Sequence, residues 1–124
     1  MAIDFHFALE DRPGTGARVL SAIADAGINV IGVCAVAGGQ EVHLAVEDRD
    51  AAGTRRALEG VGVAIGDERP VTVVPVENRP GAGAALLQRL ADAGINVDAL
   101  YLATDTRVIL SAANPEAVQQ LVAS

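Results

Sequence analysis

The chain has 124 residues, a formal net charge of −7, and 51 % hydrophobic but only 2 % aromatic residues. This acidic balance excludes nucleic acid as an expected partner, because phosphate binding needs a surplus of basic side chains. No apolar run approaches the roughly 20 residues of a membrane span, so no membrane contact is expected. The single Cys34 and an N-terminus without a signal-peptide pattern together predict a cytoplasmic protein.

The first half predicts a strand, a helix, two strands, a helix and a strand. Residues 3–10 alternate apolar and polar side chains, which is typical of a half-buried strand. A helix is expected over 17–27, with Gly27 ending it in a left-handed conformation and Ile28 making the apolar contact of such a cap. The later elements expected are strands over 28–36 and 40–48 joined by a hairpin turn at Gly38–Gly39, a helix over 49–62 and a strand over 63–68.

The second half repeats the first. The stretch "RPGTGARVLSAIADAGINV" begins at Arg12, and "RPGAGAALLQRLADAGINV" begins at Arg79. The elements expected here are strands over 70–77, 95–104 and 107–112, a turn at Asp105–Thr106, and helices over 84–94 and 114–123, with Asn114 as N-cap and Pro115 at the first helical position. No stretch matches the strand over 63–68, so an open sheet edge is expected in this half.

These patterns predict an α+β fold of two ferredoxin-like units, residues 1–68 and 69–124, with antiparallel sheets and helices on one face. The second unit is expected to lack its last strand. Units of about sixty residues are marginally stable alone, so we expect them to pack together and to form a homodimer or a higher oligomer.

The second sheet is expected to be apolar on both faces, and therefore covered on both. Helices cover one face, and a partner sheet from the other half or another chain is expected on the other. The residues assigned to the face away from the helices are Val71, Val73, Ala99, Tyr101 and Leu110. Those assigned to the opposite face are Val74, Val76, Leu100 and Ile109.

The repeated "RPGxG" stretch has a purely structural interpretation, since proline and glycine suit the entry of a strand into a helix. It also has a functional interpretation. A helix N-terminus offers free N–H groups and a positive dipole end that suit a carboxylate, and an asparagine both donates and accepts. The topology is expected to bring Asn78 close to Asn96, and Asp11 close to Asn29. Such a corner could hold a free amino acid, whereas no nucleophile–base pair supports an enzyme.

Each half resembles an ACT domain, a small ligand-binding module attached to many enzymes of amino-acid metabolism. The likeness rests on "EDRPGTG…ADAGINV" and "ENRPGAG…ADAGINVDALYLAT". The second stretch is similar to the regulatory domain of phosphoglycerate dehydrogenase, which binds serine, although Val76 stands where that branch has a histidine. The whole chain resembles free-standing tandem ACT proteins, which have no catalytic domain.

The resemblance implies an amino acid bound between two units, by the loop before the first helix of one and the second strand of its neighbour. The residues it marks are Asp11, Arg12, Pro13, Gly14 and Asn29 in the first half, and Asn78, Arg79, Pro80, Gly81 and Asn96 in the second. Asp11 stands in place of the loop asparagine. We expect a non-catalytic regulatory module with no cofactor and a possible enzyme partner. The alternative is an oligomerisation scaffold of the same fold with no small-molecule ligand.

A second candidate site lies on the face of the first sheet away from the helices. If the hairpin turns at Gly38–Gly39, Cys34 is opposite His43, and His6 on the neighbouring strand faces the same way. Asp4 shares that face. Cysteine, histidine and aspartate are zinc ligands, so His6, Cys34 and His43 form a possible metal set. The alternative is a partly polar interface between stacked sheets.

Overall fold

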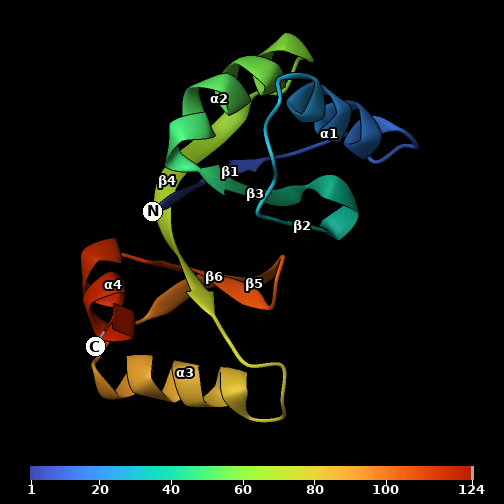
Figure 1. Ribbon diagram of the computed structural model, residues 1–124. Coiled ribbons are helices and arrows are strands. Elements are labelled where there is room, and N and C mark those ends of the chain that lie inside the picture. The colour runs from blue at the N-terminus through green and yellow to red at the C-terminus, as the bar shows by residue number, and fades with distance from the viewer. Residues whose placement is uncertain (124) are drawn as a thin grey trace. The chain divides into compact units, whose positions relative to one another are not determined.

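The computed structural model describes residues 1–123, and the chain divides into two compact units, Met1–Arg69 and the residues from Pro70 onward. Helices and antiparallel strand pairs alternate along both units (Figure 1). The expected fold class is confirmed: both units are ferredoxin-like, and the described part of the second has no final strand. Within residues 1–123, every helix is too short or too polar to cross a bilayer.

The first unit has the strand order β2-β3-β1-β4 that a β-α-β-β-α-β chain adopts in this fold. Its elements are β1 (Ala2–Phe7), α1 (Thr15–Asp25), β2 (Gly32–Val36), β3 (Glu41–Glu47), α2 (Ala51–Gly60) and the start of β4 (Ile65–Pro75). Strand β4 is continuous where two strands, over 63–68 and 70–77, were expected. Its first residues belong to the first unit and its last residues to the second.

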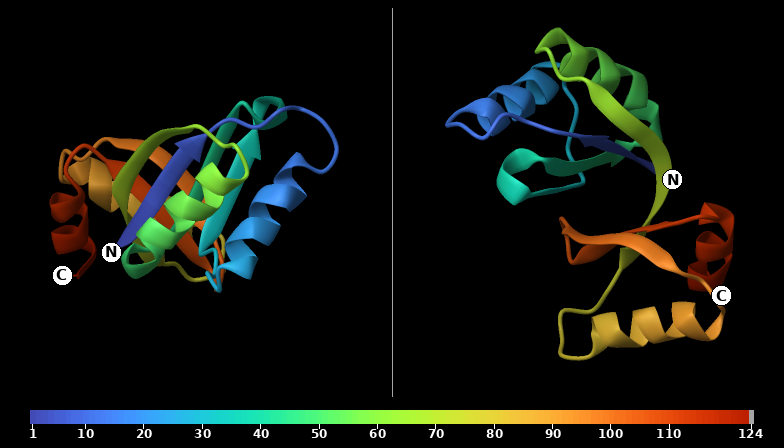
Figure 2. Two further views of the ribbon diagram at one scale, coloured as in Figure 1. Left: turned by 90° about the horizontal axis from the view of Figure 1, so that it is seen from above. Right: turned by 180° about the vertical axis from the view of Figure 1, so that it is seen from behind.

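Helices α1 and α2 cover one face of the first sheet (Figure 2). Because side chains alternate along a strand, Phe5 of β1 and Leu44 of β3 point to the helices, while His6 and His43 point to the other face. The buried core on the helix side consists of Phe5, Phe7, Val19, Ile23, Val42, Leu44, Val46, Leu58 and Val63.

The second unit has the strand order β4-β6-β5. After the end of β4 its elements are α3 (Ala82–Asp92), β5 (Val97–Ala103), β6 (Arg107–Ala112) and α4 (Pro115–Ala123). Its separate core consists of Val74, Leu86, Leu90, Val108, Leu110, Ala112 and Val118. The predicted cap of the last helix is present, since Asn114 Oδ1 accepts the Ala117 amide at 3.3 Å.

The repeated "ADAGIN" stretch ends a helix in the same way in both units. At the end of α1 the Gly27 amide donates to Ala24 O at 2.9 Å, and the Ile28 amide donates to Ile23 O at 3.2 Å. Gly27 has a φ of 75°, and the equivalent glycine after α3, Gly94, has a φ of 72°. This is the left-handed helix end that the sequence predicts.

The connection between β5 and β6 differs from the expected two-residue turn at Asp105–Thr106. Ala103 pairs with Arg107, so the turn contains three residues. Asp105 and Thr106 both have positive φ, of 60° and 52°. One additional residue in a hairpin turn shifts the register by one and exchanges the two faces of a strand.

Two side chains of β6 were therefore assigned to the wrong faces. Ile109 pairs with Tyr101 and Val73, on the face away from the helices. Leu110 pairs with Leu100 and belongs to the core beneath the helices. The face away from the helices is still apolar, with Ile109 in the place that Leu110 was expected to take. A partner sheet over this face stays a prediction.

Candidate functional site

The corner before α1 is held by contacts within the first unit. The Leu9 amide donates to Gly39 O at 2.7 Å, which ties the loop to the turn between β2 and β3. Thr15 Oγ1 donates to Glu10 O at 3.0 Å, and the Arg12 guanidinium binds the Glu10 carboxylate. The loop enters the helix through Gly14, whose φ of 92° lies in the left-handed region that glycine tolerates best.

The corner before α3 has the same geometry. Arg79 binds the Glu77 carboxylate, and the Arg79 amide donates to Glu77 O at 2.9 Å. Gly81 enters the helix with a φ of 88°, and the Val76 amide donates to Thr106 O of the β5–β6 turn at 2.9 Å. The repeated "RPGxG" stretch therefore builds one local structure twice.

No side chain caps the first turn of α1 or α3. The residue before each helix is a glycine, Gly14 or Gly81, which has no side chain to accept a hydrogen bond. Helix α4 differs, because Asn114 caps it. The Ala82 amide of α3 donates to Arg79 O at 3.3 Å. The other first-turn amides, with the positive dipole end of each helix, suit an acceptor that the cap residue does not supply, such as a carboxylate.

A hollow lies beside each corner. The one in the first unit has a volume of about 360 Å³, and its lining includes Arg12, Gly14 and Thr15. The one in the second unit has a volume of about 350 Å³, and its lining includes Arg79 and Ala82. These volumes are at the lower end of those of small-molecule sites and leave room for a free amino acid.

The arginine of each corner is already paired with a carboxylate of its own loop. The hydrogen bond and charge of Arg12 hold the pKa of Glu10 below its ordinary value of 4.5. A ligand carboxylate therefore has to compete with Glu10 for Arg12, or bind the helix amides instead. The amides are the better candidates, because Gly14, the residue before the helix, makes no side-chain cap bond to them.

The expected proximity of Asn78 to Asn96 within one unit is wrong. Asn78 precedes the eleven-residue α3 and Asn96 follows it, so the length of a helix, roughly 16 Å, separates them. Asp11 and Asn29 stand at opposite ends of α1 for the same reason. Asn96 instead lines a hollow of about 450 Å³ with Asp98 and Asn114, at the far end of the second unit from Asn78.

All ten residues marked by the resemblance are exposed: Asp11, Arg12, Pro13, Gly14, Asn29, Asn78, Arg79, Pro80, Gly81 and Asn96. Within one unit they form two groups, one at each end of the first helix. Asp11 lies over the β2–β3 turn, where a Cβ atom added to Gly38 would come within 2.8 Å of its Oδ2 atom.

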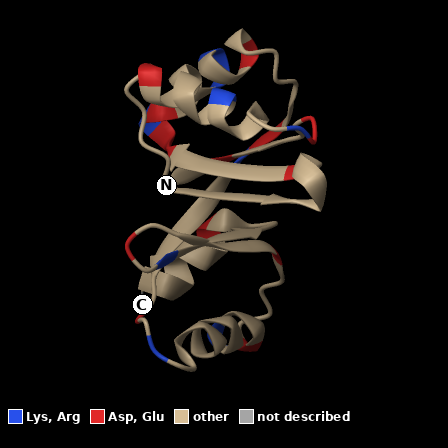
Figure 3. Cartoon of the chain, turned by 90° about the vertical axis from the view of Figure 1, so that its right-hand side faces the viewer, with Lys and Arg blue, Asp and Glu red and all other residues tan. Residues whose placement is uncertain are grey.

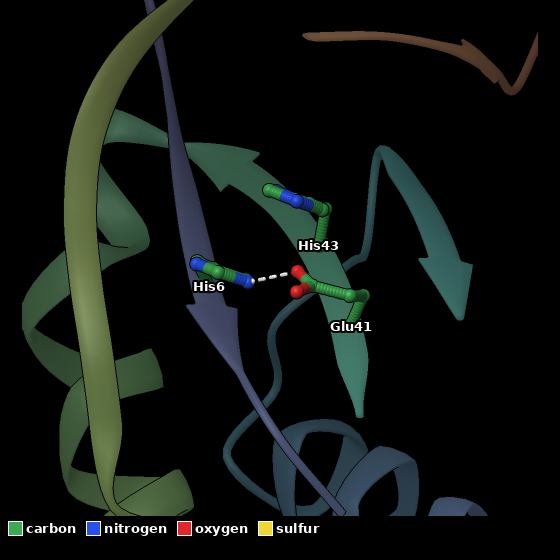
Figure 4. A group of neighbouring side chains, drawn as sticks. All are labelled: His6, Glu41 and His43. Atoms are coloured by element: carbon green, nitrogen blue, oxygen red, sulfur yellow. Dashed lines mark hydrogen bonds and ion pairs between the residues drawn. The ribbon is translucent and has the colours of Figure 1, made fainter. Parts of the chain in front are cut away.

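The second candidate site is a histidine pair on the first sheet. His6 of β1 and His43 of β3 are register partners, and their rings stack with centroids 4.5 Å apart and planes 2° apart (Figure 4). His6 Nε2 lies 2.6 Å from Glu41 Oε2. His43 Nδ1 lies 2.9 Å from Oδ2 of Asp4, a side chain that is only 2 % exposed.

The sequence anticipated part of this cluster. Cys34 pairs with His43, as a turn at Gly38–Gly39 predicts. His6, expected on the same face, is the register partner of His43 on the other side. Among the described residues, however, the group whose ligand atoms lie within 4.8 Å of one another is His6, Glu41 and His43, without Cys34. Glu41 was missed, although its position two residues before His43 places it on the same face.

Basic and acidic residues are interspersed in the described part of the chain (Figure 3). Several are paired within the first unit, such as Arg55 with Glu68 and Arg49 with Glu47.

No protein-family model matches the chain, and no curated protein matches it. Solved structures do. The regulatory subunit of aspartate kinase from Thermus thermophilus, in its ligand-free form, is 26 % identical, with a TM-score of 0.72 over 98 % of this chain and 89 % of that one. The corresponding subunit from Thermus flavus is 23 % identical, with a TM-score of 0.70 over 98 % and 90 % of the two chains. Protein BT0572 from Bacteroides thetaiotaomicron is 21 % identical, with a TM-score of 0.75 over 98 % and 85 %.

These matches cover nearly the whole of both partners, so they concern the pair of units and not one unit alone. The fold is that of ACT-type regulatory domains. The aspartate kinase matches that are covered almost in full include regulatory subunits and a putative regulatory domain, which is consistent with a non-catalytic regulatory module. Longer aspartate kinase chains also match, over 24–32 % of their length.

Proposed function

We propose that this chain is a regulatory module that binds a free amino acid between two ACT units. Binding of the amino acid would change the activity of an enzyme partner. The observation that carries the proposal is the duplicated corner: a helix N-terminus without a side-chain cap, entered through Gly14 or Gly81, beside a hollow with room for a free amino acid. The structures similar to this chain include regulatory subunits of aspartate kinase, so an aspartate kinase is the partner to test first.

The binding mode follows from the separation of the two polar groups in each unit. A corner supplies helix amides for the carboxylate of the ligand. The asparagine that precedes the second strand of a neighbouring unit, Asn29 or Asn96, supplies an amide group for the other polar end. The neighbour is the other half of the chain or a second copy.

Regulation would work through linkage. A ligand that prefers one packing of the units stabilises that packing, and the enzyme partner responds to the change in population. A ligand at 100 times its Kd adds about 2.7 kcal/mol to the stability of the state that binds it. A shift of this size is readily measured as a change in melting temperature.

The test is a thermal-shift screen of the whole chain against the twenty amino acids, followed by calorimetry on any ligand found. Serine is among them because of the likeness of the second repeat to a serine-binding domain. Asn96→Ala and Asn29→Ala are expected to weaken binding at the two equivalent positions by tenfold or more. Gln88→Ala is the matched control, since Gln88 is an exposed amide that bonds Asp92 of its own helix.

Binding by one amino acid, lost in the asparagine variants and kept in Gln88→Ala, supports the proposal. The absence of any shift at millimolar amino acid contradicts it. The effect on the partner is tested separately, by adding the chain with and without ligand to the aspartate kinase of the same organism. A kinase whose rate responds to neither addition contradicts the choice of partner.

A scaffold without a small-molecule ligand is the second candidate. It is favoured by large apolar side chains left exposed on the outer strands, Leu100 and Leu102 on β5 and Val33 and Val36 on β2. Leu102 is 74 % exposed, which is unusual for leucine on a strand. A stable oligomer that Leu102→Ser dissociates, in a chain that binds no amino acid, would favour this function.

A further inference from the structure

The histidine cluster of the first unit is independent of the corners. The chain has two histidines, and both lie on the face of β1 and β3 away from the helices, with Glu41 and Asp4 beside them. We propose that this cluster is a zinc site in which His6, His43 and Glu41 are the ligands and Asp4 positions His43.

The donor set suits zinc. Two imidazole nitrogens and one carboxylate oxygen are typical ligands of this ion, with a fourth position taken by water. Ligand atoms around a tetrahedral zinc lie roughly 3.3 Å apart, given metal–ligand distances near 2 Å. The ligand atoms of His6, Glu41 and His43 already lie within 4.8 Å of one another, so movements of the side chains alone would close the site.

Asp4 has the position of an outer-shell partner. Its Oδ2 atom is 2.9 Å from His43 Nδ1, and its side chain is buried within the sheet. A histidine that donates its Nδ1 proton to a carboxylate carries its lone pair on Nε2. Metal-binding histidines are commonly oriented in this way, by a carboxylate on the nitrogen that does not bind the metal.

Metal binding requires the two rings to leave their parallel stack, because the in-plane lone pairs of parallel rings do not converge on one point. His6 and Glu41 have room to move, with side chains 38 % and 54 % exposed. The 2.6 Å contact between His6 Nε2 and Glu41 Oε2 would widen as both atoms turn to the ion. His43 would stay in place against Asp4 and act as the fixed ligand.

The second unit provides an internal comparison. Register places Val73 where His6 stands, Ile109 where His43 stands, and Arg107 where Glu41 stands. None of these three side chains binds zinc. The proposal therefore predicts one zinc ion per chain, whereas adventitious binding by exposed carboxylates has no reason to give that ratio.

The experiment uses the whole chain without a histidine tag, and zinc alone as the probe. Calorimetry and competition with a chromophoric chelator are expected to give one site per chain. His6→Ala and His43→Ala are each expected to weaken binding at least tenfold, as is Glu41→Gln. Glu47→Gln is the matched control, because Glu47 lies on the same strand and face and pairs with Arg49; its affinity should equal that of the unchanged protein.

Cobalt(II) as a second probe identifies the ligands by absorption. The proposal predicts a spectrum without a sulfur-to-cobalt charge-transfer band and an affinity unchanged in Cys34→Ser. Asp4→Asn is expected to lower the affinity by about ten- to a hundredfold while circular dichroism shows an intact fold. A merely structural role for Asp4 would leave metal affinity unchanged in every variant that folds.

Three results would overturn the proposal: no binding at 100 µM zinc, binding that survives loss of both histidines, or an affinity that depends on Cys34 and not on Glu41. Should His43→Ala fail to fold, His43→Gln and Glu41→Gln decide the question, since both keep the size of the side chain. Zinc binding is measured without any amino acid present, so its outcome is separate from that of the proposed regulatory function.

Discussion

The two units share their corners and differ on the face of the sheet away from the helices. Before α1 and α3 the chain forms the same loop, with a glutamate–arginine pair and a glycine at φ near 90°. On the sheet face, His6 and His43 of the first unit correspond to Val73 and Ile109 of the second. The two units therefore have the same residues where the backbone conformation of the loop requires them. They differ on the sheet face, where side chains only pack or bind a ligand.

This difference separates two kinds of constraint. A glycine at positive φ and a left-handed helix end are demanded by the backbone, so the same residues occur in both units. The side chains on the sheet face away from the helices depend instead on what packs against that face. The second unit has apolar side chains on this face, whereas the first unit has two histidines and two carboxylates.

Truncation of the equivalent core residues gives the largest expected effect and tests whether the two cores are equally important. Ile23 of α1 and Leu90 of α3 are both fully buried. Ile23→Ala and Leu90→Ala are each expected to lower the free energy of unfolding by about 2–5 kcal/mol, through lost burial and the cavity left behind. Denaturant titration followed by circular dichroism measures the loss.

The controls for this pair are Leu20→Ala and Leu87→Ala, at equivalent positions on the outer sides of the same two helices. These side chains are 42 % and 41 % exposed, so each change should cost less than about 1 kcal/mol. A core variant no more destabilised than its control would show that its unit contributes little to the cooperative fold.

Replacement of the corner glycines gives an intermediate effect and tests whether the shared loops are shared for backbone reasons. Gly14→Ala and Gly81→Ala force alanine to a φ near 90°, which costs about 1–2 kcal/mol. Gly16→Ala is the control within α1, because a Cβ atom there meets no neighbour and alanine favours the helix. Thermal melts should move in opposite directions for Gly14→Ala and Gly16→Ala; movement in the same direction would refute the backbone explanation.

The smallest expected effect is a pH dependence confined to the first unit. Arg55 of α2 makes two hydrogen bonds of 2.7 Å to Glu68 of β4, and these lower the pKa of Glu68 from its ordinary value of 4.5. A carboxylate with a lowered folded-state pKa stabilises the protein above the unfolded-state value, and the contribution is lost as the pH falls through the folded-state value. The exposed arginine makes the contribution modest.

Glu68→Gln should therefore be slightly less stable than the unchanged protein at pH 7, with the difference shrinking below pH 4.5. Asp67→Asn, at the preceding position on β4, is the control for the removal of one carboxylate. Urea denaturation at several pH values measures both. A difference that grows as the pH falls would show that the sign assigned to this ion pair is wrong.

The fold was readable from the sequence because its signals are local and occur twice. Gly27 followed by Ile28 predicts a helix end, and Asn114 followed by Pro115 predicts a helix start; both are present. The register of β2 and β3 also followed from one turn, Gly38–Gly39. The β5–β6 turn was predicted one residue too short, because threonine is common in strands and Thr104 was therefore assigned to β5. That one residue shifted the register and exchanged the faces assigned to Leu110 and Ile109.

The candidate site was harder to predict, because it depends on where in space each element begins and ends as well as on the order of residues in the sequence. Asn78 and Asn96 flank one helix in the sequence, and only the geometry of that helix shows how far apart they are. Glu41 lacked the chemical distinctiveness of histidine or cysteine, so its approach to His6 within 2.6 Å was visible only in the structure.

Strand β4 has a practical consequence for any attempt to dissect this protein. It is a single run of eleven residues whose beginning belongs to the first unit and whose end belongs to the second. Cutting the gene between Arg69 and Pro70 would divide this strand. Each fragment would then carry an incomplete strand and exposed backbone groups that promote aggregation. The two units thus share one strand, and a fragment prepared to study either unit should include all of β4.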